Sequence, residues 1–338
     1  MRLYGIIRSV LFLLEPERAH QVSLFTMDWL NKLGLLRFIF GRPLPAPVSV
    51  MGIQFKNPIG LAAGLDKNGD HIDALSACGF GFIEIGTITP KPQAGNAKPR
   101  LFRLLEDDAI INRMGFNNKG VDYLIKRVKE SNPDCVLGIN IGKNKVTDNA
   151  DAASDYLLCF KKVYSVADYI TVNISSPNTP GLRELQHGDT LKDLLFQLKQ
   201  EQAALHVETG RYVPLVVKIA PDLESDEIKS LAMTLISVHV DGVIATNTTN
   251  HRPDSLTSEH KDEQGGLSGE PLTTLSNQLL TVLSEQLDGQ IPIIASGGVM
   301  SPRDIQQKLA LGASLVQIYS GFIYHGPALI HSGVKSIN

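Results

Sequence analysis

The chain has few cysteines, one tryptophan and almost no net charge. Its 338 residues include three cysteines, and 32 Lys and Arg nearly balance 35 Asp and Glu, for a net charge of −3. Nucleic-acid-binding proteins need a basic surface, so this balance argues against that class. The cysteines, at positions 78, 135 and 159, are widely spaced and form no CxxC motif. We interpret them as buried, reduced thiols of a cytosolic protein, and we expect no metal ion.

Long apolar runs are also missing. No run approaches the roughly 18–20 residues that a membrane-spanning helix needs. The run VLFLL at 10–14 is followed directly by EPERAH, without the small residues of a signal-peptide cleavage site. The sequence therefore predicts neither a transmembrane helix nor a secretion signal.

The first 42 residues differ in composition from the rest of the chain. They hold six Lys and Arg against three Asp and Glu, and six of the 21 aromatic residues, including the only tryptophan. Apolar residues at helical spacing predict helices over about 3–14 and about 17–34. The proline-rich stretch 41–50 predicts a stiff linker. We therefore expect residues 1–42 to form a helical segment ahead of a larger domain over residues 43–338.

From about residue 51 the chain alternates between short apolar runs and amphipathic helical patterns. The runs are apolar on both faces, as parallel strands covered by helices must be. They predict eight strands, at IGLAA (59–63), FIEIG (82–86), VLGINI (136–141), YITVNI (169–174), LVVKIA (215–220), GVIAT (242–246), IPIIAS (291–296) and LVQIYS (315–320). Helical patterns cover 188–207 and 225–239, and SPRD at 301–304 is a strong helix start. Eight strand–helix units predict an α/β fold, the (β/α)8 TIM barrel, with a doubly wound sheet as the alternative.

Two insertions and the strand ends indicate where a site lies. Residues 87–117 and 247–269 are too long for simple connections, and loops of that length usually form lids or binding loops. Both follow the carboxyl ends of predicted strands, the face where barrel enzymes carry their chemistry. Almost every predicted strand ends in glycine or polar residues, which together predict one polar pocket. The motifs SGGV (296–299) and YSG (319–321) predict a phosphate site made of backbone N–H groups.

Lys218 and the loop NISSPNTPGL (173–182) each allow two interpretations. A lysine inside an apolar strand needs an anionic partner. That partner is either Asp222 or an anionic cofactor or substrate at the barrel mouth, and we favour the second. In the loop, Pro177 and Pro180 stiffen a segment rich in hydroxyls and carboxamides. One of its serines either acts in catalysis or only stabilises a turn.

Long motifs in the chain match one family. They are NPIGLAAGLDKNG (57–69), IEIGTITPKPQAGNAKPRLFRL (83–104), INRMGFNN (111–118), NISSPNTPGLR (173–183), VKIAPD (217–222), ATNTT (245–249), GGLSGEPL (265–272) and SGGV (296–299), with PERAH (16–20) near the start. On these residues the chain resembles the class 2 dihydroorotate dehydrogenases, which are membrane-associated and quinone-dependent. The resemblance covers essentially the whole chain.

The resemblance implies oxidation of dihydroorotate to orotate in pyrimidine biosynthesis, with FMN as redox cofactor and ubiquinone or menaquinone as electron acceptor. It implies that FMN contacts Ala62, Ala63, Gly64, Thr87, Asn140, Asn173, Lys218, Thr246, Gly269, Gly298, Tyr319 and Ser320. It implies that the substrate contacts Lys67, Asn112, Gly115, Phe116, Asn173, Asn178, Asn247 and Thr248. Of the two adjacent serines it assigns Ser176, not Ser175, as the base that removes the C5 proton while a hydride leaves C6. Thr179 or water would then relay the proton.

The resemblance also gives the N-terminal helices a role. Short amphipathic helices can lie in a membrane interface without spanning it, and the implied quinone tunnel is lined by His20, Arg103 and Tyr319. We therefore expect a peripheral, monomeric protein at the cytoplasmic face of the inner membrane, with no nucleic-acid partner. Alternatively, these helices only pack against the barrel.

Other functions stay open on the sequence alone. One is another FMN-dependent barrel oxidoreductase, or a soluble dihydroorotate dehydrogenase that uses fumarate or NAD. The chain has no strand–GxGxxG–helix unit, which argues against a nicotinamide site. A flavin-free phosphate-binding barrel and a non-enzymatic binding module on the membrane are the remaining alternatives.

Overall fold

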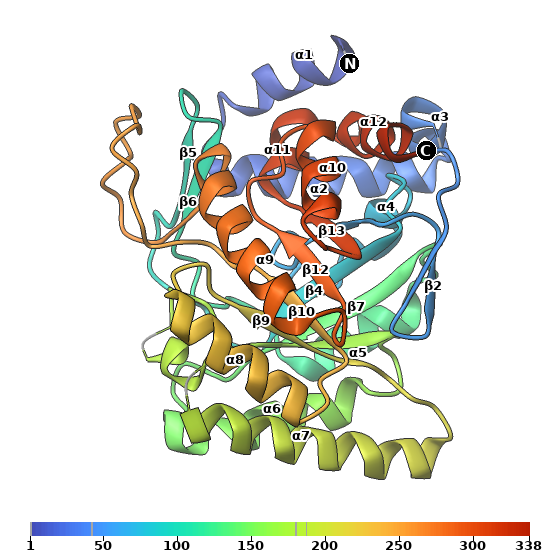
Figure 1. The fold of residues 1–338 in the computed structure, drawn as a ribbon. Coiled ribbons are helices and arrows are strands. Elements are labelled where there is room, and N and C mark those ends of the chain that lie inside the picture. Colours follow the sequence, from blue (N-terminus) through green and yellow to red (C-terminus); the bar gives the residue numbers. More distant parts are fainter. Residues whose placement is uncertain (1, 42, 180, 187) are drawn as a thin grey trace.

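Eight parallel strands close into a barrel in the computed structural model, which describes residues 2–41, 43–179, 181–186 and 188–338 (Figure 1). The strands are β3 (Ile59–Leu61), β4 (Phe82–Ile88), β7 (Val136–Ile141), β8 (Tyr169–Asn173), β9 (Leu215–Ile219), β10 (Gly242–Ala245), β12 (Ile293–Ser296) and β13 (Leu315–Ile318). They pair in this order around the barrel, and β13 closes on β3. The predicted TIM barrel is confirmed, and each predicted strand is present.

Helices cover the outside of the barrel. They are α4 (Ile72–Ser76), α5 (Val121–Glu130), α6 (Ala152–Val163), α7 (Gly188–Thr209), α8 (Ser225–Ser237), α9 (Thr273–Leu287), α10 (Pro302–Ala310), α11 (Ser320–His325) and α12 (Pro327–Ile337). Strands β4, β8 and β9 are buried at every residue, which explains why their sequences are apolar on both faces. The predicted helical patterns correspond to α7 and α8, and Ser301 begins α10 with a capping box to Asp304.

A hairpin that the sequence analysis missed closes the amino end of the barrel. Strands β1 (Val48–Val50) and β2 (Ile53–Phe55) are antiparallel, so the expectation of a stiff linker over 41–50 is wrong at its last three residues. Met51 and Gly52 form the two-residue turn between these strands. Both have positive φ, as a type I′ hairpin turn requires. Val50 and Phe55 pack against the first residues of the barrel strands.

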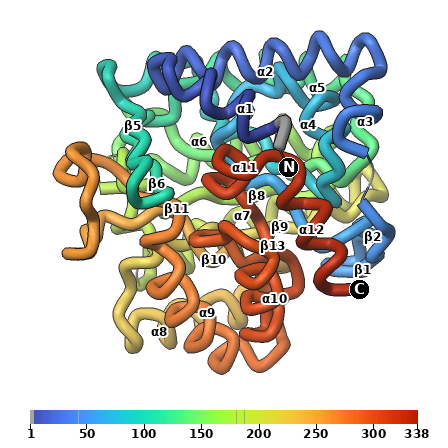
Figure 2. Tube along the Cα trace, turned by 90° about the horizontal axis from the view of Figure 1, so that it is seen from above, coloured from blue at the N-terminus to red at the C-terminus, as the bar shows by residue number. Residues whose placement is uncertain are grey.

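The two insertions form one small sheet at the opposite, carboxyl end. Strands β5 (Leu101–Leu104) and β6 (Ala109–Asn112) come from the first insertion, and β11 (Gly266–Gly269) from the second. The order is β11–β6–β5, antiparallel throughout. This sheet lies at the end of the barrel away from the β1–β2 hairpin (Figures 1 and 2). The expected lids are therefore joined to each other.

Three helices precede the barrel and lie along its side: α1 (Arg2–Leu11), α2 (Pro16–Lys32) and the unpredicted α3 (Leu35–Phe40). Helix α2 runs along one edge beside α4 (Figure 2). Eleven of the nineteen exposed large apolar side chains among the described residues belong to positions 6–39, so these helices are amphipathic. None of the described helices has the length and apolarity to cross a bilayer. The expected boundary at residue 42 falls outside the described residues and stays a prediction.

Candidate active site

A pocket at the carboxyl ends of the barrel strands gathers nearly all of the predicted cofactor and substrate residues. Of the predicted cofactor residues, it is lined by Ala62, Ala63, Gly64, Thr87, Asn173, Lys218, Thr246, Gly269, Gly298, Tyr319 and Ser320. Ser176 also lines it, together with Lys67, Asn112, Gly115, Phe116, Asn178, Asn247 and Thr248 from the substrate set. Ser296 and Gly297 of the predicted phosphate motif share the lining, and so do Ser268 and Gln317, to which no role was assigned from the sequence.

Asn140 does not line the pocket but lies one layer below it. Thr87 Oγ1 donates a hydrogen bond to Asn140 Oδ1 at 2.6 Å, and Asn140 Nδ2 donates to Glu84 Oε1 at 2.8 Å. The other Glu84 oxygen accepts hydrogen bonds from Tyr169, Thr171 and Gln317. Glu84 is thus a buried anion inside the barrel that the sequence analysis missed. The one charged residue in the apolar run FIEIG was the available signal.

Lys218 projects from β9 into the pocket and is 5% exposed. Its ammonium donates no hydrogen bond to any residue that the structure describes. Burial lowers the pKa of Lys218, and the charge of Glu84 opposes that shift. Asp222 is paired with Arg183 at 2.7 Å, so the interpretation of a Lys218–Asp222 ion pair is wrong. A buried cation without a hydrogen-bonding partner fits an anionic or electron-rich ligand.

The end of the pocket beyond β12 and β13 offers free backbone donors. Gly298 has a φ of +71°, and a Cβ at this position would lie 2.3 Å from the Cα of Thr273. Only glycine lets the loop run this close to α9. Within the described part of the chain, the N–H groups of Gly297 and Gly298 donate no hydrogen bond. The Ser320 hydroxyl lies near, 2.9 Å from that of Ser268. Such a group of donors can hold a phosphate without a cation.

Carboxamides from three loops line the other side of the pocket. Asn247 Nδ2 donates to Asn173 Oδ1 at 3.3 Å, and Asn178 Nδ2 donates to Asn112 Oδ1 at 3.3 Å. Lys67 Nζ donates to the Gly64 carbonyl at 2.7 Å. Burial and the nearby charge of Arg100 lower the pKa of Lys67 to about 8. These side chains place hydrogen-bond donors and acceptors side by side. Lys67 adds an ammonium group whose pKa lies close to neutral pH.

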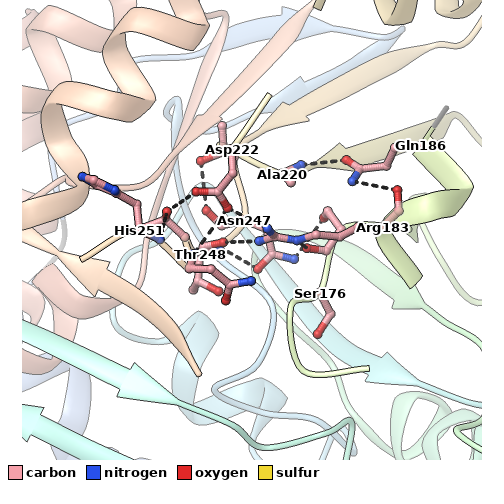
Figure 3. Close-up of polar contacts among 12 residues, drawn as sticks. Ser176, Arg183, Gln186, Ala220, Asp222, Asn247, Thr248 and His251 are labelled. Carbon is pink, nitrogen blue, oxygen red and sulfur yellow. Dashed lines mark hydrogen bonds and ion pairs between the residues drawn. The ribbon is translucent and has the colours of Figure 1, made fainter. Parts of the chain in front are cut away.

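The two adjacent serines have different surroundings. Ser175 Oγ lies 3.2 Å from Asn173 Oδ1 and accepts a hydrogen bond from Asn247 Nδ2 at 3.0 Å. Ser176 Oγ lines the pocket and accepts one hydrogen bond, from the Asn178 N–H at 3.2 Å. The Ser176 side chain points away from the polar cluster around Asp222 (Figure 3). Thr179 is buried nearby, and Pro180 of this loop lies outside the described residues. Ser176 is therefore the serine with a hydroxyl available to a ligand.

A second, apolar cavity lies between the N-terminal helices and the barrel. His20, Arg103 and Tyr319 all line it, with apolar side chains of α1, α2 and α11 around them. The Arg103 guanidinium lies 4.6 Å from the centre of the Phe12 ring and donates to the Leu14 carbonyl. Burial and the charge of Lys67 lower the pKa of His20 to about 4, so its imidazole is neutral at pH 7. Tyr319 lines both cavities and forms part of the wall between them.

An eight-stranded parallel barrel with a polar pocket at its strand ends defines a (β/α)8-barrel enzyme. The chain belongs to the dihydroorotate dehydrogenase family. The family model described as "Dihydroorotate dehydrogenase" matches residues 46–338. Membership makes the chain an oxidoreductase that depends on a flavin.

Relatives match the chain over nearly its whole length. The dihydroorotate dehydrogenase (quinone) of Marinobacter nauticus is 54% identical over 335 residues, which cover 99% of this chain and 98% of that protein. The protein of the same name from Proteus mirabilis is 55% identical over 337 residues, 99% of both. The crystal structure of Eimeria tenella DHODH in complex with ferulenol has a TM-score of 0.86 and 40% identity, covering 95% of this chain and 90% of that one.

Proposed function

We propose that the chain oxidises dihydroorotate to orotate in pyrimidine biosynthesis, with FMN as its cofactor and a membrane quinone as electron acceptor. The observation that carries this proposal is the position of Tyr319, which lines both the polar pocket and the apolar cavity. A polar substrate and an apolar acceptor would thus reach opposite sides of one wall. The relatives that are named as quinone-type enzymes support the same acceptor.

The donors and acceptors of the pocket fit FMN. The free N–H groups of Gly297 and Gly298 and the hydroxyl of Ser320 suit its phosphate. Gln317 Oε1 is buried without a hydrogen-bond partner among the described residues, and Lys218 also lacks one. A ring edge that alternates N–H and carbonyl groups would satisfy both. The redox chemistry that bound FMN would supply is acceptance of a hydride from the substrate and electron transfer to the quinone.

Further contacts to FMN follow from the family resemblance. They are assigned to Ala62, Ala63, Gly64, Thr87, Asn173, Thr246, Gly269 and Tyr319. Asn140 acts one layer further back, since it holds the Thr87 hydroxyl through its hydrogen bond. Lys218 would place a positive charge beside the flavin ring. A fixed cation there stabilises the negative charge that the ring gains when it is reduced.

The substrate would occupy the side of the pocket that the carboxamides line. Asn112, Asn178 and Asn247 suit a pyrimidine ring, because a carboxamide both donates and accepts hydrogen bonds. Gly115, Phe116, Asn173 and Thr248 complete this side of the pocket. The ammonium of Lys67 suits the substrate carboxylate. A ring that left these groups unpaired would bind poorly.

Ser176 acts as the base. Its Oγ takes the proton from C5 of dihydroorotate while the hydride leaves C6, and the double bond of orotate forms between these carbons. The hydroxyl proton of Ser176 passes to Thr179 or to water. A serine hydroxyl is a weak base, so negative charge on its oxygen must be stabilised. The Asn178 N–H, 3.2 Å from Ser176 Oγ, supplies such a hydrogen bond.

The apolar cavity would admit the quinone from the membrane. His20, Arg103 and Tyr319 are the polar side chains expected to meet its head group. The exposed apolar residues of α1 to α3 would lie in the membrane interface beside the opening. We expect a monomer bound peripherally to the cytoplasmic face of the inner membrane.

A steady-state assay tests the function. The purified protein should contain FMN and oxidise dihydroorotate with a soluble quinone. Turnover with fumarate or NAD in place of the quinone would favour a soluble type of dihydroorotate dehydrogenase. A protein that stays colourless after FMN is added would favour a flavin-free barrel.

A further inference from the structure

We propose that Arg183 is a positioning residue for the reaction, because its guanidinium holds the loop that carries Ser176 against two neighbouring loops. This inference rests on the proposed role of Ser176 as the base. Arg183 lies in the short 3-10 helix η2 (Leu182–Gln186) that ends this loop. It does not line the pocket, so it acts on the reaction only through other residues.

The guanidinium joins three strand-end loops at one point (Figure 3). Arg183 Nε donates to the Ser175 carbonyl at 3.2 Å, within its own loop after β8. Its Nη1 pairs with Asp222 Oδ2 at 2.7 Å in the loop after β9. Its Nη2 donates to the Thr248 carbonyl at 3.0 Å in the loop after β10. All three contacts use different nitrogens, as only a planar guanidinium can provide.

The contact to Ser175 matters most, because Ser175 directly precedes the base. The Arg183–Ser175 hydrogen bond closes the loop on itself, and the ion pair to Asp222 anchors that closed loop to the barrel. Asp222 is held in turn by the Thr249 hydroxyl and the Asn250 N–H. The backbone at Ser176 is therefore fixed relative to the residues assigned to the substrate.

Gln186 supports the same arrangement from the other end of η2. Its Oε1 accepts a hydrogen bond from the Ala220 N–H at 2.9 Å, and its Nε2 donates to the Arg183 carbonyl at 3.4 Å. Gln186 is 3% exposed. Two side chains of one helical turn thus bind the loop after β9, so η2 cannot shift without breaking both contacts.

Rapid-mixing measurements on the FMN-loaded protein test this role. The rate of flavin reduction by dihydroorotate should fall about 10- to 100-fold in Arg183→Gln, because a displacement of about 1 Å has that effect on a reaction step. The FMN content and the rate of reoxidation by a soluble quinone should stay close to those of the wild type. Arg183→Lys should recover part of the rate, since an ammonium can pair with Asp222 but cannot reach all three partners.

Asp222→Asn provides a second route to the same result. Asp222→Asn should also slow flavin reduction. The double variant with Arg183→Gln should be slowed by less than the product of the two single effects, because both substitutions remove the same Arg183–Asp222 contact. If Arg183→Gln does not fold, Asp222→Asn and Arg183→Lys decide the question alone.

A matched control lies at the other end of the same two strands. Arg211 pairs with Asp168 at 3.2 Å and so joins the segments that lead into β9 and β8 at the amino end of the barrel. Arg211→Gln should lower stability without changing the reduction rate. The proposal is overturned if Arg183→Gln and Asp222→Asn are reduced at the wild-type rate, or if reoxidation slows as much as reduction. A wild-type protein that dihydroorotate does not reduce would instead refute the proposed function.

Discussion

Arg100 donates two hydrogen bonds to Glu17 Oε1, from Nε at 3.1 Å and from Nη2 at 3.0 Å, and both side chains are buried. The pair joins α2 to the loop before β5, and Arg100 also donates to the carbonyls of Ala94 and Asn96. Burial alone would raise the pKa of Glu17, but Arg100 and Lys98 lower it. Deleting the N-terminal helices would remove the carboxylate that pairs with Arg100, and removing one partner of a buried ion pair is strongly destabilising.

A substitution inside the apolar cavity therefore tests the quinone route better than a deletion. Ala19 is 7% exposed and lines the cavity from α2. Ala19→Phe should fill part of the apolar cavity. It should lower the rate of quinone reduction about 10-fold or more, because the quinone could no longer approach in a productive orientation. Reduction by dihydroorotate should not change. Gln21→Phe, exposed on the same helix and outside the cavity, is the control. If Ala19→Phe and Gln21→Phe reduce the quinone at the same rate, the apolar cavity is not the quinone route.

Ser176→Ala tests the assignment of the base. Removing the hydroxyl should slow flavin reduction by dihydroorotate about 10²- to 10⁴-fold, the usual contribution of general base catalysis. Orotate should still bind, because the carboxamides and Lys67 are unaffected. Stopped-flow absorbance gives the rate, and a titration of the flavin spectrum gives the affinity. An unchanged reduction rate would remove Ser176 from the mechanism.

Orotate binding should depend on the protonation of Lys67. Burial and Arg100 lower the pKa of this lysine to about 8 in the free protein, and the ligand carboxylate favours its charged form. Below this pKa the ammonium is already present, so the affinity should not depend on pH. Above it the dissociation constant should rise, approaching about tenfold per pH unit. Lys67→Met should bind more weakly and lose the dependence. A constant affinity in the wild type across this range would show that Lys67 does not pair with the carboxylate.

The exposed aromatic residues of α2 and α3 should mediate membrane binding. Phe25, Trp29 and Phe38 are 68%, 60% and 87% exposed. Replacing all three with serine should weaken binding to phospholipid vesicles on the order of 100-fold, given the apolar area that is lost. Phe196→Ser changes an exposed aromatic on α7 and should leave vesicle binding intact. Sedimentation with vesicles measures both, and equal binding of the triple variant and the wild type would contradict the membrane role.

The barrel could be predicted from the sequence because its strands are buried on both faces. Runs such as GVIAT and IPIIAS are almost entirely apolar, as expected for strands of a parallel sheet that is covered by helices. Strands β5, β6 and β11 lie in the two insertions that we interpreted as lids or binding loops, and β11 pairs with a strand more than a hundred positions earlier in the chain. The β1–β2 hairpin was missed because the preceding prolines suggested a linker.

Most of the residues that line the pocket were named from the sequence, but the contacts between them were not. Glycine and carboxamide residues at strand ends must meet at one barrel mouth, so their gathering follows from topology. The Lys218–Asp222 interpretation was wrong because Asp222 pairs instead with Arg183, which comes from the loop after the neighbouring strand β8. The Glu84 network and the Arg183 contacts depend on which side chains face each other across strands, and strand spacing along the sequence does not determine that.

Anaerobic reduction and reoxidation of the purified protein tests the central claim most directly. One equivalent of dihydroorotate per bound FMN should bleach the flavin absorbance, and a soluble quinone should then restore it while fumarate and NAD do not. A flavin spectrum that dihydroorotate leaves unchanged, or one that recovers equally with fumarate or NAD, would contradict the account.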